Sequence, residues 1–191
     1  MTKKLCLAML VLLASSAIAA AQAQPAQQSA QDFTIAKVMD HGLSNTEKEF
    51  VDAADAMPEN KYNFVPTNGE FKGVRTFAQQ VKHVAAVNYL VFATVLGEKP
   101  PVDTGEENGP ASIKSKAEIT KFLRDSFAYG HRALATLTPE NSVAPIDSPF
   151  GKDKVTRLGM ATLIIGHCFD HYGQMVVYLR TNGIVPPASR K

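Results

Sequence analysis

The residues best suited to chemistry in this chain are two histidines four positions apart, His167 and His171, within the apolar run 158–179. On a helix this spacing puts both imidazoles on one face, one turn apart, where a single metal ion can contact both. The same face is expected to turn toward the core, because it also carries Met160, Leu163, Ile164, Gln174, Met175 and Tyr178. Two imidazoles on such a face need polar partners, since a buried polar group without one costs about 1–3 kcal/mol.

A third histidine, His83, lies on another apolar helical stripe, with Gln80, Val87, Leu90 and Thr94. Three imidazoles from two helices of a bundle can converge on one divalent ion and leave its fourth position open, as catalytic zinc sites do. The alternative is satisfied core or surface histidines, because five histidines give a pair at this spacing in roughly one shuffled chain in eight. Spacing and placement together favour a metal site on His83, His167 and His171, with binding that weakens below about pH 6 as the imidazoles become protonated.

Two polar residues beside the last two histidines are candidates to support the site. Gln174 follows His171 by three residues, so it can donate to a group near the ion or bond to a neighbouring helix as a core-edge amide. Asp170 lies three residues after His167 and to one side of the pair, where it can orient an imidazole. The more common role of such an aspartate is a solvated or interhelical charge. Both alternatives stay open for each residue.

The remaining reactive side chains are assigned to packing or to the surface. Cys168 follows His167 directly, which turns it about 100° around the helix, so we expect it to pack in the core. His41 and His131 match no partner spacing and are expected at the surface. Aromatic residues at helical spacing are expected in the core, namely Tyr89, Tyr129 and Tyr178. The sequence contains no P-loop, dinucleotide-binding glycine pattern, Gly-x-Ser-x-Gly elbow or Cys-x-x-Cys pair.

The N-terminal residues follow the order of a secretory signal peptide. A short basic start, residues 1–4, precedes an apolar stretch over residues 5–19, and small residues then permit cleavage after Ala21 or Ala23. The apolar stretch is too short to be read as a spanning helix. We therefore predict that residues 1–23 are a signal peptide and that the protein is exported, to the periplasm or the medium.

Cleavage of this peptide changes the charge and the cysteine count of the chain. It takes Lys3 and Lys4 from the 20 basic side chains and leaves 18, equal to the 18 acidic ones. A balanced chain gives no reason to expect nucleic acid or an anionic membrane as partner. Cys168 becomes the only cysteine, so no disulfide within the chain is expected. Cys6 lies too far upstream of the cleavage sequence to be lipidated, so no stable membrane anchor is expected either.

The mature chain has the pattern of an all-α protein, a four-helix bundle with long connections. Residues 24–32 are rich in Gln, Ala and Ser and form a loose leader, and residues 33–187 form the bundle domain. Helices are expected over residues 33–57, 76–97, 115–138 and from 154–157 to 181. Capping boxes predict two of the starts, at Thr76 with Gln79 and at Ser115 with Glu118.

The connections between these helices are rich in glycine and proline. Residues 61–73 and 141–153 are expected as loops, and no strand alternation competes with the helical pattern. Residues 98–112 form a connection long enough to run the height of a bundle. The second and third helices therefore need not be antiparallel neighbours.

Two stretches of the chain resemble a known family. Residues 167–187, from His167 through Asn182-Gly183 to Pro186-Pro187, closely resemble the closing motif of the DinB-like superfamily of four-helix bundles. The runs 57–67 and 77–84 resemble the region before and through that family's second helix. The resemblance spans essentially the whole mature chain. It implies that the family's metal triad, one histidine on the second helix and two on the last, falls on His83, His167 and His171.

The resemblance also implies a cofactor and an assembly, but not one reaction. Family members bind divalent ions such as zinc or nickel, and many form homodimers, so both are expected here. Some members are thiol transferases that use a low-molecular-weight thiol, others are described as metal-dependent hydrolases, and most have no assigned reaction. Of these two reactions, thiol transfer fits less well, because reduced cofactor thiols belong to the cytosol and this chain is predicted to be exported.

Three functions stay open for the exported protein. The first is a metal-dependent hydrolase or thiol transferase that acts on an unknown small molecule. The second is a non-catalytic metal or small-ligand binding protein of the cell envelope. The third is a bundle whose triad is only a structural staple, for which a closed four-ligand site would be expected.

Overall fold

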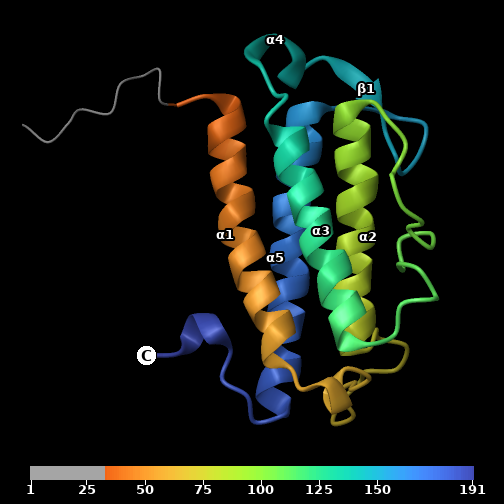
Figure 1. Ribbon diagram of the computed structural model, residues 1–191, viewed down its shortest axis with the longest axis vertical. Coiled ribbons are helices and arrows are strands. Elements are labelled where there is room, and N and C mark those ends of the chain that lie inside the picture. The colour runs from red at the N-terminus through yellow and green to blue at the C-terminus, as the bar shows by residue number, and fades with distance from the viewer. Residues whose placement is uncertain (1–32) are drawn as a thin grey trace, which may run out of the picture. The chain divides into compact units, whose positions relative to one another are not determined.

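The computed structural model describes residues 33–191 of the chain. The predicted signal peptide, residues 1–23, and the leader, residues 24–32, lie outside the described residues. Four long helices lie side by side in the described unit (Figure 1): α1 (Ile35–Ala56), α2 (Phe77–Leu96), α3 (Lys116–Leu134) and α5 (Arg157–Thr181). Helix α2 packs against α3 and α5, and α1 packs against the same two helices, so α1 and α2 occupy opposite corners. The predicted four-helix bundle is confirmed.

The direction of the helices follows from the long connection between α2 and α3. It descends along the outside of the bundle, so α2 and α3 run in the same direction while α1 and α5 run in the other (Figure 1). Both predicted capping boxes form, with the Thr76 and Ser115 hydroxyls accepting hydrogen bonds from the amides of Gln79 and Glu118. Helix α2 ends at Gly97, whose φ of 73° is the left-handed conformation that glycine adopts without strain.

The segment before α5 is more ordered than the sequence predicted. Residues 141–153 were expected as a loop, but a short helix α4 (Pro139–Ser142) reaches into this segment, and strand β1 (Pro145–Asp147) pairs antiparallel with β2 (Lys154–Thr156). Three-residue strands are too short to show an alternating pattern, which explains why the prediction was wrong here. Two short 3₁₀ turns, η2 (Glu59–Lys61) and η3 (Pro187–Ser189), complete the described elements.

Apolar side chains from all four long helices fill the core. Its largest fully buried members include Phe50, Phe77, Phe92 and Phe127. Cys168 is fully buried among them, and burial raises the pKa of its thiol well above the ordinary value, so its assignment to packing is confirmed. Tyr89, Tyr129 and Tyr178 are buried as predicted. Leu163 departs from the predicted core face of α5 and is 39% exposed.

No helix within residues 33–191 is both long and apolar enough to cross a membrane.

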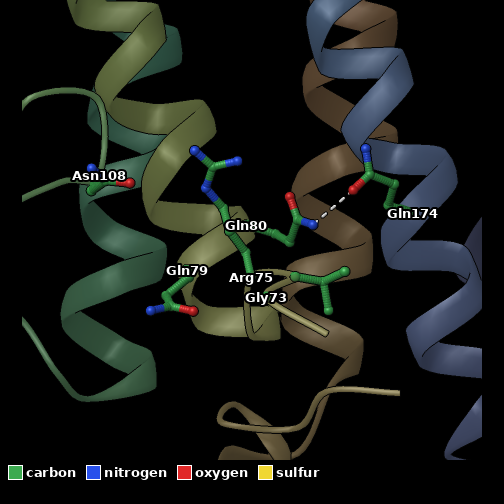
Figure 2. Close-up of a pocket in the computed structure, with 7 residues that line it drawn as sticks. Gly73, Arg75, Gln79, Gln80, Asn108 and Gln174 are labelled. Atoms are coloured by element: carbon green, nitrogen blue, oxygen red, sulfur yellow. Dashed lines mark hydrogen bonds between the residues drawn. The ribbon is translucent and has the colours of Figure 1, made fainter. Parts of the chain in front are cut away.

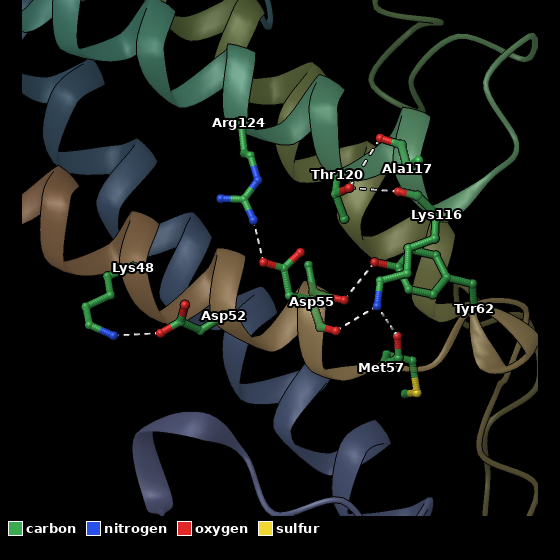
Figure 3. A network of polar contacts seen from close by, with 10 residues as sticks. Lys48, Asp52, Asp55, Met57, Tyr62, Lys116, Ala117, Thr120 and Arg124 are labelled. Atoms are coloured by element: carbon green, nitrogen blue, oxygen red, sulfur yellow. Dashed lines mark hydrogen bonds and ion pairs between the residues drawn. The ribbon is translucent and has the colours of Figure 1, made fainter.

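A lysine of α3 closes the end of α1 (Figure 3). The Lys116 ammonium donates to the backbone oxygens of Asp55 at 2.7 Å and Met57 at 2.8 Å, and it lies 5.7 Å from the centre of the Tyr62 ring. The last turn of α1 has no basic residue of its own. Lys116 therefore supplies the positive charge that the exposed carbonyls of a helix C-terminus favour.

Replacing this lysine tests the contact between α1 and α3. Lys116→Met keeps most of the apolar stem of the side chain but removes the ammonium and both hydrogen bonds, and it is expected to lower the free energy of unfolding by about 1–2 kcal/mol. Lys121→Met is the matched control, because Lys121 pairs only with Asp125 one turn along the same helix. Such an exposed pair contributes about 0.5 kcal/mol or less. Urea unfolding followed by circular dichroism measures both, and equal losses would contradict the assigned role of Lys116.

His131 also links α3 to α1, which corrects the prediction that it is a surface histidine. Its Nδ1 lies 2.6 Å from Asp40 Oδ1 and its Nε2 lies 2.9 Å from Glu47 Oε2, and only 29% of the side chain is exposed. Burial opposes protonation of the ring, but the hydrogen bonds and charges of the two carboxylates outweigh it and raise the pKa of His131. His41, in contrast, is exposed as predicted.

The raised pKa of His131 predicts a pH-dependent contribution to stability. Because the folded pKa is above the unfolded one, the stabilisation is fully present below the unfolded pKa of about 6.5 and is lost as pH rises through the folded pKa. His131→Gln is therefore expected to lower the free energy of unfolding by about 1 kcal/mol at pH 5.5 and by less at pH 9, since the site is partly screened by solvent. Urea unfolding at the two pH values measures this, with His41→Gln as control. A loss that is the same at both pH values would contradict it.

Candidate metal centre

Helices α2 and α5 bring three histidines together. His83 comes from α2, and His167 and His171 come from successive turns on one face of α5. One ring nitrogen from each lies within 4.8 Å of those of the other two. The ring centres are 5.1 Å apart for His83 and His167, 4.8 Å for His83 and His171, and 4.5 Å for the α5 pair. These are the three residues that the sequence spacing selected.

Hydrogen bonds fix the orientation of two of the three rings. His83 Nδ1 lies 2.6 Å from the backbone oxygen of Glu107, and His171 Nδ1 lies 2.6 Å from Gln80 Oε1. Both oxygens only accept, so each Nδ1 carries the proton and donates it. In the neutral rings Nε2 is then the atom with a free lone pair, the tautomer in which a histidine binds a metal through Nε2.

The arrangement of the nitrogens fits one divalent ion. His83 Nε2 and His167 Nε2 are 3.2 Å apart. Two ligands of a tetrahedral zinc site, each about 2.0–2.1 Å from the ion, are separated by about 3.3 Å. Without metal, His167 Nε2 donates to the unprotonated His83 Nε2, and among the described residues His167 Nδ1 is buried without a hydrogen-bond partner. Three imidazoles with this spacing are the donor set that zinc and similar divalent ions prefer.

The surroundings keep the three rings in the neutral form that coordinates metals. Burial lowers the pKa of all three, and His83 and His171 are only 6% and 7% exposed. Burial, the neighbouring histidines and the charge of Arg75 bring the pKa of His167 to about 3. Burial and the charges of His83 and Arg75 lower the pKa of His171 to about 4, although the negative charge of Asp170 acts in the opposite direction. Protons therefore compete for these nitrogens at a lower pH than the value near 6 expected for ordinary histidines.

A chain of amides supports His171. Gln80 Nε2 donates to Gln174 Oε1 at 2.8 Å, as Figure 2 shows, and Gln174 Nε2 donates to Asp170 Oδ2 at 3.0 Å. Gln174 therefore bonds to the neighbouring helix and reaches His171 only through Gln80. Asp170 makes no hydrogen bond to an imidazole and acts on the site through Gln174 and through its charge. Both predicted supporting residues lie beside the site, Gln174 one hydrogen bond and Asp170 two hydrogen bonds further along this chain than Gln80.

Sequence reasoning missed the two groups that hold the rings. Gln80 lies three residues before His83 on the same stripe, so its position on the site face was visible although its pairing with His171 was not. The carbonyl of Glu107 is a backbone atom and leaves no signature in the sequence. It reaches His83 because Glu106 and Glu107 adopt positive φ angles of 50° and 72°, which are unusual for residues other than glycine. Such backbone strain is concentrated at functional sites.

Two cavities open beside the three rings. One, of about 480 Å³, has mostly apolar walls and is lined by His83, Val87, Glu107, Phe150, Thr162, Leu163, Gly166, His167 and Asp170. The other, of about 580 Å³, is lined by Gly73, Val74, Arg75, Gln79, Gln80, Asn108 and Gln174. The exposed Leu163 thus forms part of a cavity wall instead of the core. Access from solvent to His83 and His167 is the arrangement of a reactive or ligand-binding site, not of a closed staple.

The fold and the site together define the class of protein: a four-helix bundle with three histidines converging from its second and last long helices. The chain belongs to the DinB superfamily, whose sequence profile matches residues 43–175. That range includes all three histidines. The comparison with curated proteins gives no match.

Solved structures with the same fold share little sequence with this chain. A conserved protein from Enterococcus faecalis superposes with a TM-score of 0.62 at 18% identity, over 78% of this chain and 96% of the other. A DinB-like protein from Bacillus subtilis gives 0.61 at 16% identity, over 81% and 99%. YfiT from Bacillus subtilis gives 0.59 at 18% identity, over 84% and 94%, and is described as a probable metal-dependent hydrolase with an unusual four-helix bundle topology. At these identities the likeness shows the fold alone.

The hydrogen bond to His171 predicts a measurable role for Gln80. Gln80→Leu leaves His171 Nδ1 without its acceptor, so the affinity for zinc is expected to fall about 10–100-fold. Gln174→Leu is the matched control, because it cuts the amide chain but keeps the bond between Gln80 and His171. Its effect should be less than about 10-fold. Titration calorimetry measures both, and equal affinities of the two variants would contradict a specific role for Gln80.

Proposed function

We propose that this protein is a metal-dependent hydrolase with one divalent ion, zinc or nickel, held by His83, His167 and His171. The observation that carries the proposal is the convergence of three neutral ring nitrogens within 4.8 Å, at the edge of an open cavity. A bound ion would polarise a carbonyl or phosphoryl oxygen and lower the pKa of a water molecule. The description of YfiT, a protein of the same fold, agrees with this assignment.

Other residues of the chain orient the histidine rings, exclude water from the substrate and accept a proton. Gln80 and the Glu107 carbonyl orient the rings of His171 and His83. Apolar side chains on the cavity wall, among them Val87, Phe150 and Leu163, exclude water from one side of a substrate. Asp170 lines the same cavity as His83 and His167, and we assign its carboxylate to accept the proton that a hydrolytic water releases.

Metal analysis and a substrate screen test this proposal. Protein purified without a His tag and without added metal is expected to contain one divalent ion per chain. It should hydrolyse at least one ester or amide in a screen that also includes thiol-transfer substrates. Hydrolysis should disappear in His167→Ala and persist in His41→Ala, whose side chain is exposed and outside the site. Turnover that survives complete removal of the ion would contradict the proposal.

The second candidate is a non-catalytic protein that binds a metal or a small ligand. It is favoured by one observation, the hydrogen bond from Gln174 to Asp170 Oδ2, because a carboxylate that already accepts a hydrogen bond is a weaker base. Ion binding with normal affinity, together with no turnover in the screen, would select this candidate.

Chelation distinguishes both candidates from a structural staple. An ion at about a hundred times its dissociation constant adds about 2.7 kcal/mol to stability, so the melting temperature should fall when it is removed. The helical circular dichroism should nevertheless persist, because the core is built from all four long helices. Complete unfolding of the protein without metal would show that the triad is a structural metal site that holds the bundle together.

We also propose that the protein is exported and forms a homodimer. N-terminal sequencing of the mature protein should give a start between Gln22 and Gln24, and intact Met1 would contradict export. Light scattering of the same sample measures the assembly.

A further inference from the structure

The larger of the two cavities beside the histidines carries one positive charge and no carboxylate. Arg75 lies among the carboxamides of Gln79, Gln80, Asn108 and Gln174 on its wall (Figure 2). These amides offer N–H donors as well as acceptors, and the cavity of about 580 Å³ is large enough for a small organic molecule. The lining thus has the chemistry of a site for an anionic ligand.

This cavity is joined to the histidine cluster by shared residues. Gln80 lines it and also accepts the hydrogen bond from His171. Asn108 lines it and follows Glu107, whose carbonyl holds His83 and which lines the neighbouring cavity. A molecule in this cavity therefore lies next to Gln80, which holds His171, and to Asn108, which follows the residue that holds His83.

The Arg75 guanidinium forms no hydrogen bond or ion pair with any residue in the part of the chain that the structure describes. Within residues 33–191 the other five arginines each donate a side-chain hydrogen bond or form an ion pair, namely Arg124, Arg132, Arg157, Arg180 and Arg190. The backbone of Arg75 is nevertheless held, because its carbonyl accepts a hydrogen bond of 2.8 Å from the Tyr178 hydroxyl on α5. The next residue, Thr76, is the N-cap of α2. A fixed backbone thus presents a free guanidinium to the cavity.

We propose that Arg75 binds a carboxylate of the substrate and so selects small esters or amides whose acyl part ends in a carboxylate. This inference rests on the proposed hydrolytic function and names its substrate class. The planar guanidinium fork matches a carboxylate with two parallel hydrogen bonds. One cation surrounded by neutral amides balances a single negative charge, which favours a carboxylate over a doubly charged phosphate. Gln79 and Asn108 lie on the same wall to complete the hydrogen bonding.

Binding of metal-anchored probes tests this inference without any need for turnover. Hydroxamates chelate divalent ions, so the monohydroxamates of succinate, glutarate and adipate can place a carboxylate at three distances from a zinc ion. Alkyl hydroxamates of equal length, which end in a methyl group, are the neutral counterparts. Titration calorimetry of the zinc-loaded full chain gives the ratio of the two affinities at each length. The zinc content of each variant is measured first, to show that the site is intact.

The proposal predicts a carboxylate preference that depends on one residue. At one chain length the carboxylate probe should bind the wild-type protein about 10-fold tighter than its methyl counterpart. The ratio should fall to about 1 in Arg75→Gln. It should stay unchanged in Lys72→Gln, which removes an exposed charge from the same connection outside the cavity lining.

Three other outcomes would overturn the inference, and they separate it from the proposed function. If both probe series bound equally at every length, the proposed preference for a carboxylate substrate would be wrong, while the proposed metal site would still stand. A carboxylate preference that survives in Arg75→Gln would assign the selection to other residues. Failure of both series to bind, together with a protein that retains no zinc, would overturn the metal site and this inference with it.

Discussion

Alanine in place of His83, His167 or His171 is expected to lower the affinity for zinc by more than about 100-fold, because each change removes one of three ligands. The loss should exceed the roughly 10–100-fold typical when a group that only orients a ligand is removed. His41→Ala and His131→Ala are the controls, since the first ring is exposed and the second pairs with Asp40 and Glu47 on another face of the bundle. Calorimetric titration of the five variants measures the effect. Similar losses in all five would show that the triad is not the site.

The environment of the triad also predicts how zinc binding depends on pH. Burial holds the pKa of His167 at about 3 and that of His171 at about 4. A ring loses its ability to coordinate only when it is protonated, so binding should persist at pH 5.5 and be lost as pH falls toward about 4. Repeating the wild-type titration from pH 7 to pH 4 measures the midpoint. Half-loss at or above pH 6.5, the pKa of an unperturbed histidine, would contradict the shielded site that the structure describes.

The sequence predicts the long helices and the histidine pair of α5 because both depend on local spacing. His83, 84 positions before His167, is indicated instead by its place on a second apolar stripe and by the family resemblance. The boundaries of α2 and α3 are encoded by side chains within four residues of each end, Thr76 with Gln79 and Ser115 with Glu118. The pair His167 and His171 shares a face by helical geometry alone. The long connection before α3 shows only that parallel neighbours are allowed; the structure shows that α2 and α3 run in the same direction.

Other features of the site depend on contacts that the sequence does not encode locally. The pairing of Gln80 with His171 joins residues 91 positions apart, and the Glu107 carbonyl reaches His83 through two residues in left-handed conformations. His131 was assigned to the surface because its two acidic partners lie on α1, where no spacing rule connects them. Leu163 fits an apolar stripe, but it faces a cavity next to the histidines. In each case the surroundings in space, not the neighbours along the chain, decide the role of the residue.

Alanine substitutions of two helical glycines, Gly130 on α3 and Gly173 on α5, are expected to have opposite effects on stability, because only Gly130 lies at a close contact between helices. Gly130 lies on α3 against the ring of Phe92, which is fully buried on α2. A Cβ atom at this position would lie 2.8 Å from both Cδ2 and Cζ of that ring, well inside the contact distance of carbon atoms. Gly130→Ala is therefore expected to lower the free energy of unfolding by about 2 kcal/mol, although alanine is the better helix former by about 1 kcal/mol.

Gly173→Ala on α5 isolates the helix propensity from the packing. Gly173 is exposed, and a Cβ atom there meets nothing within 4 Å, so this variant should gain about 0.5–1 kcal/mol. Urea unfolding followed by circular dichroism gives both values on the same scale. Adding Phe92→Leu to Gly130→Ala frees space at the contact, so the double variant should lose less than the sum of the two single changes. If Gly130→Ala alone stabilised the protein, α2 and α3 would have to lie further apart than the structure places them. The backbone of α2, which carries His83, would then be displaced as well.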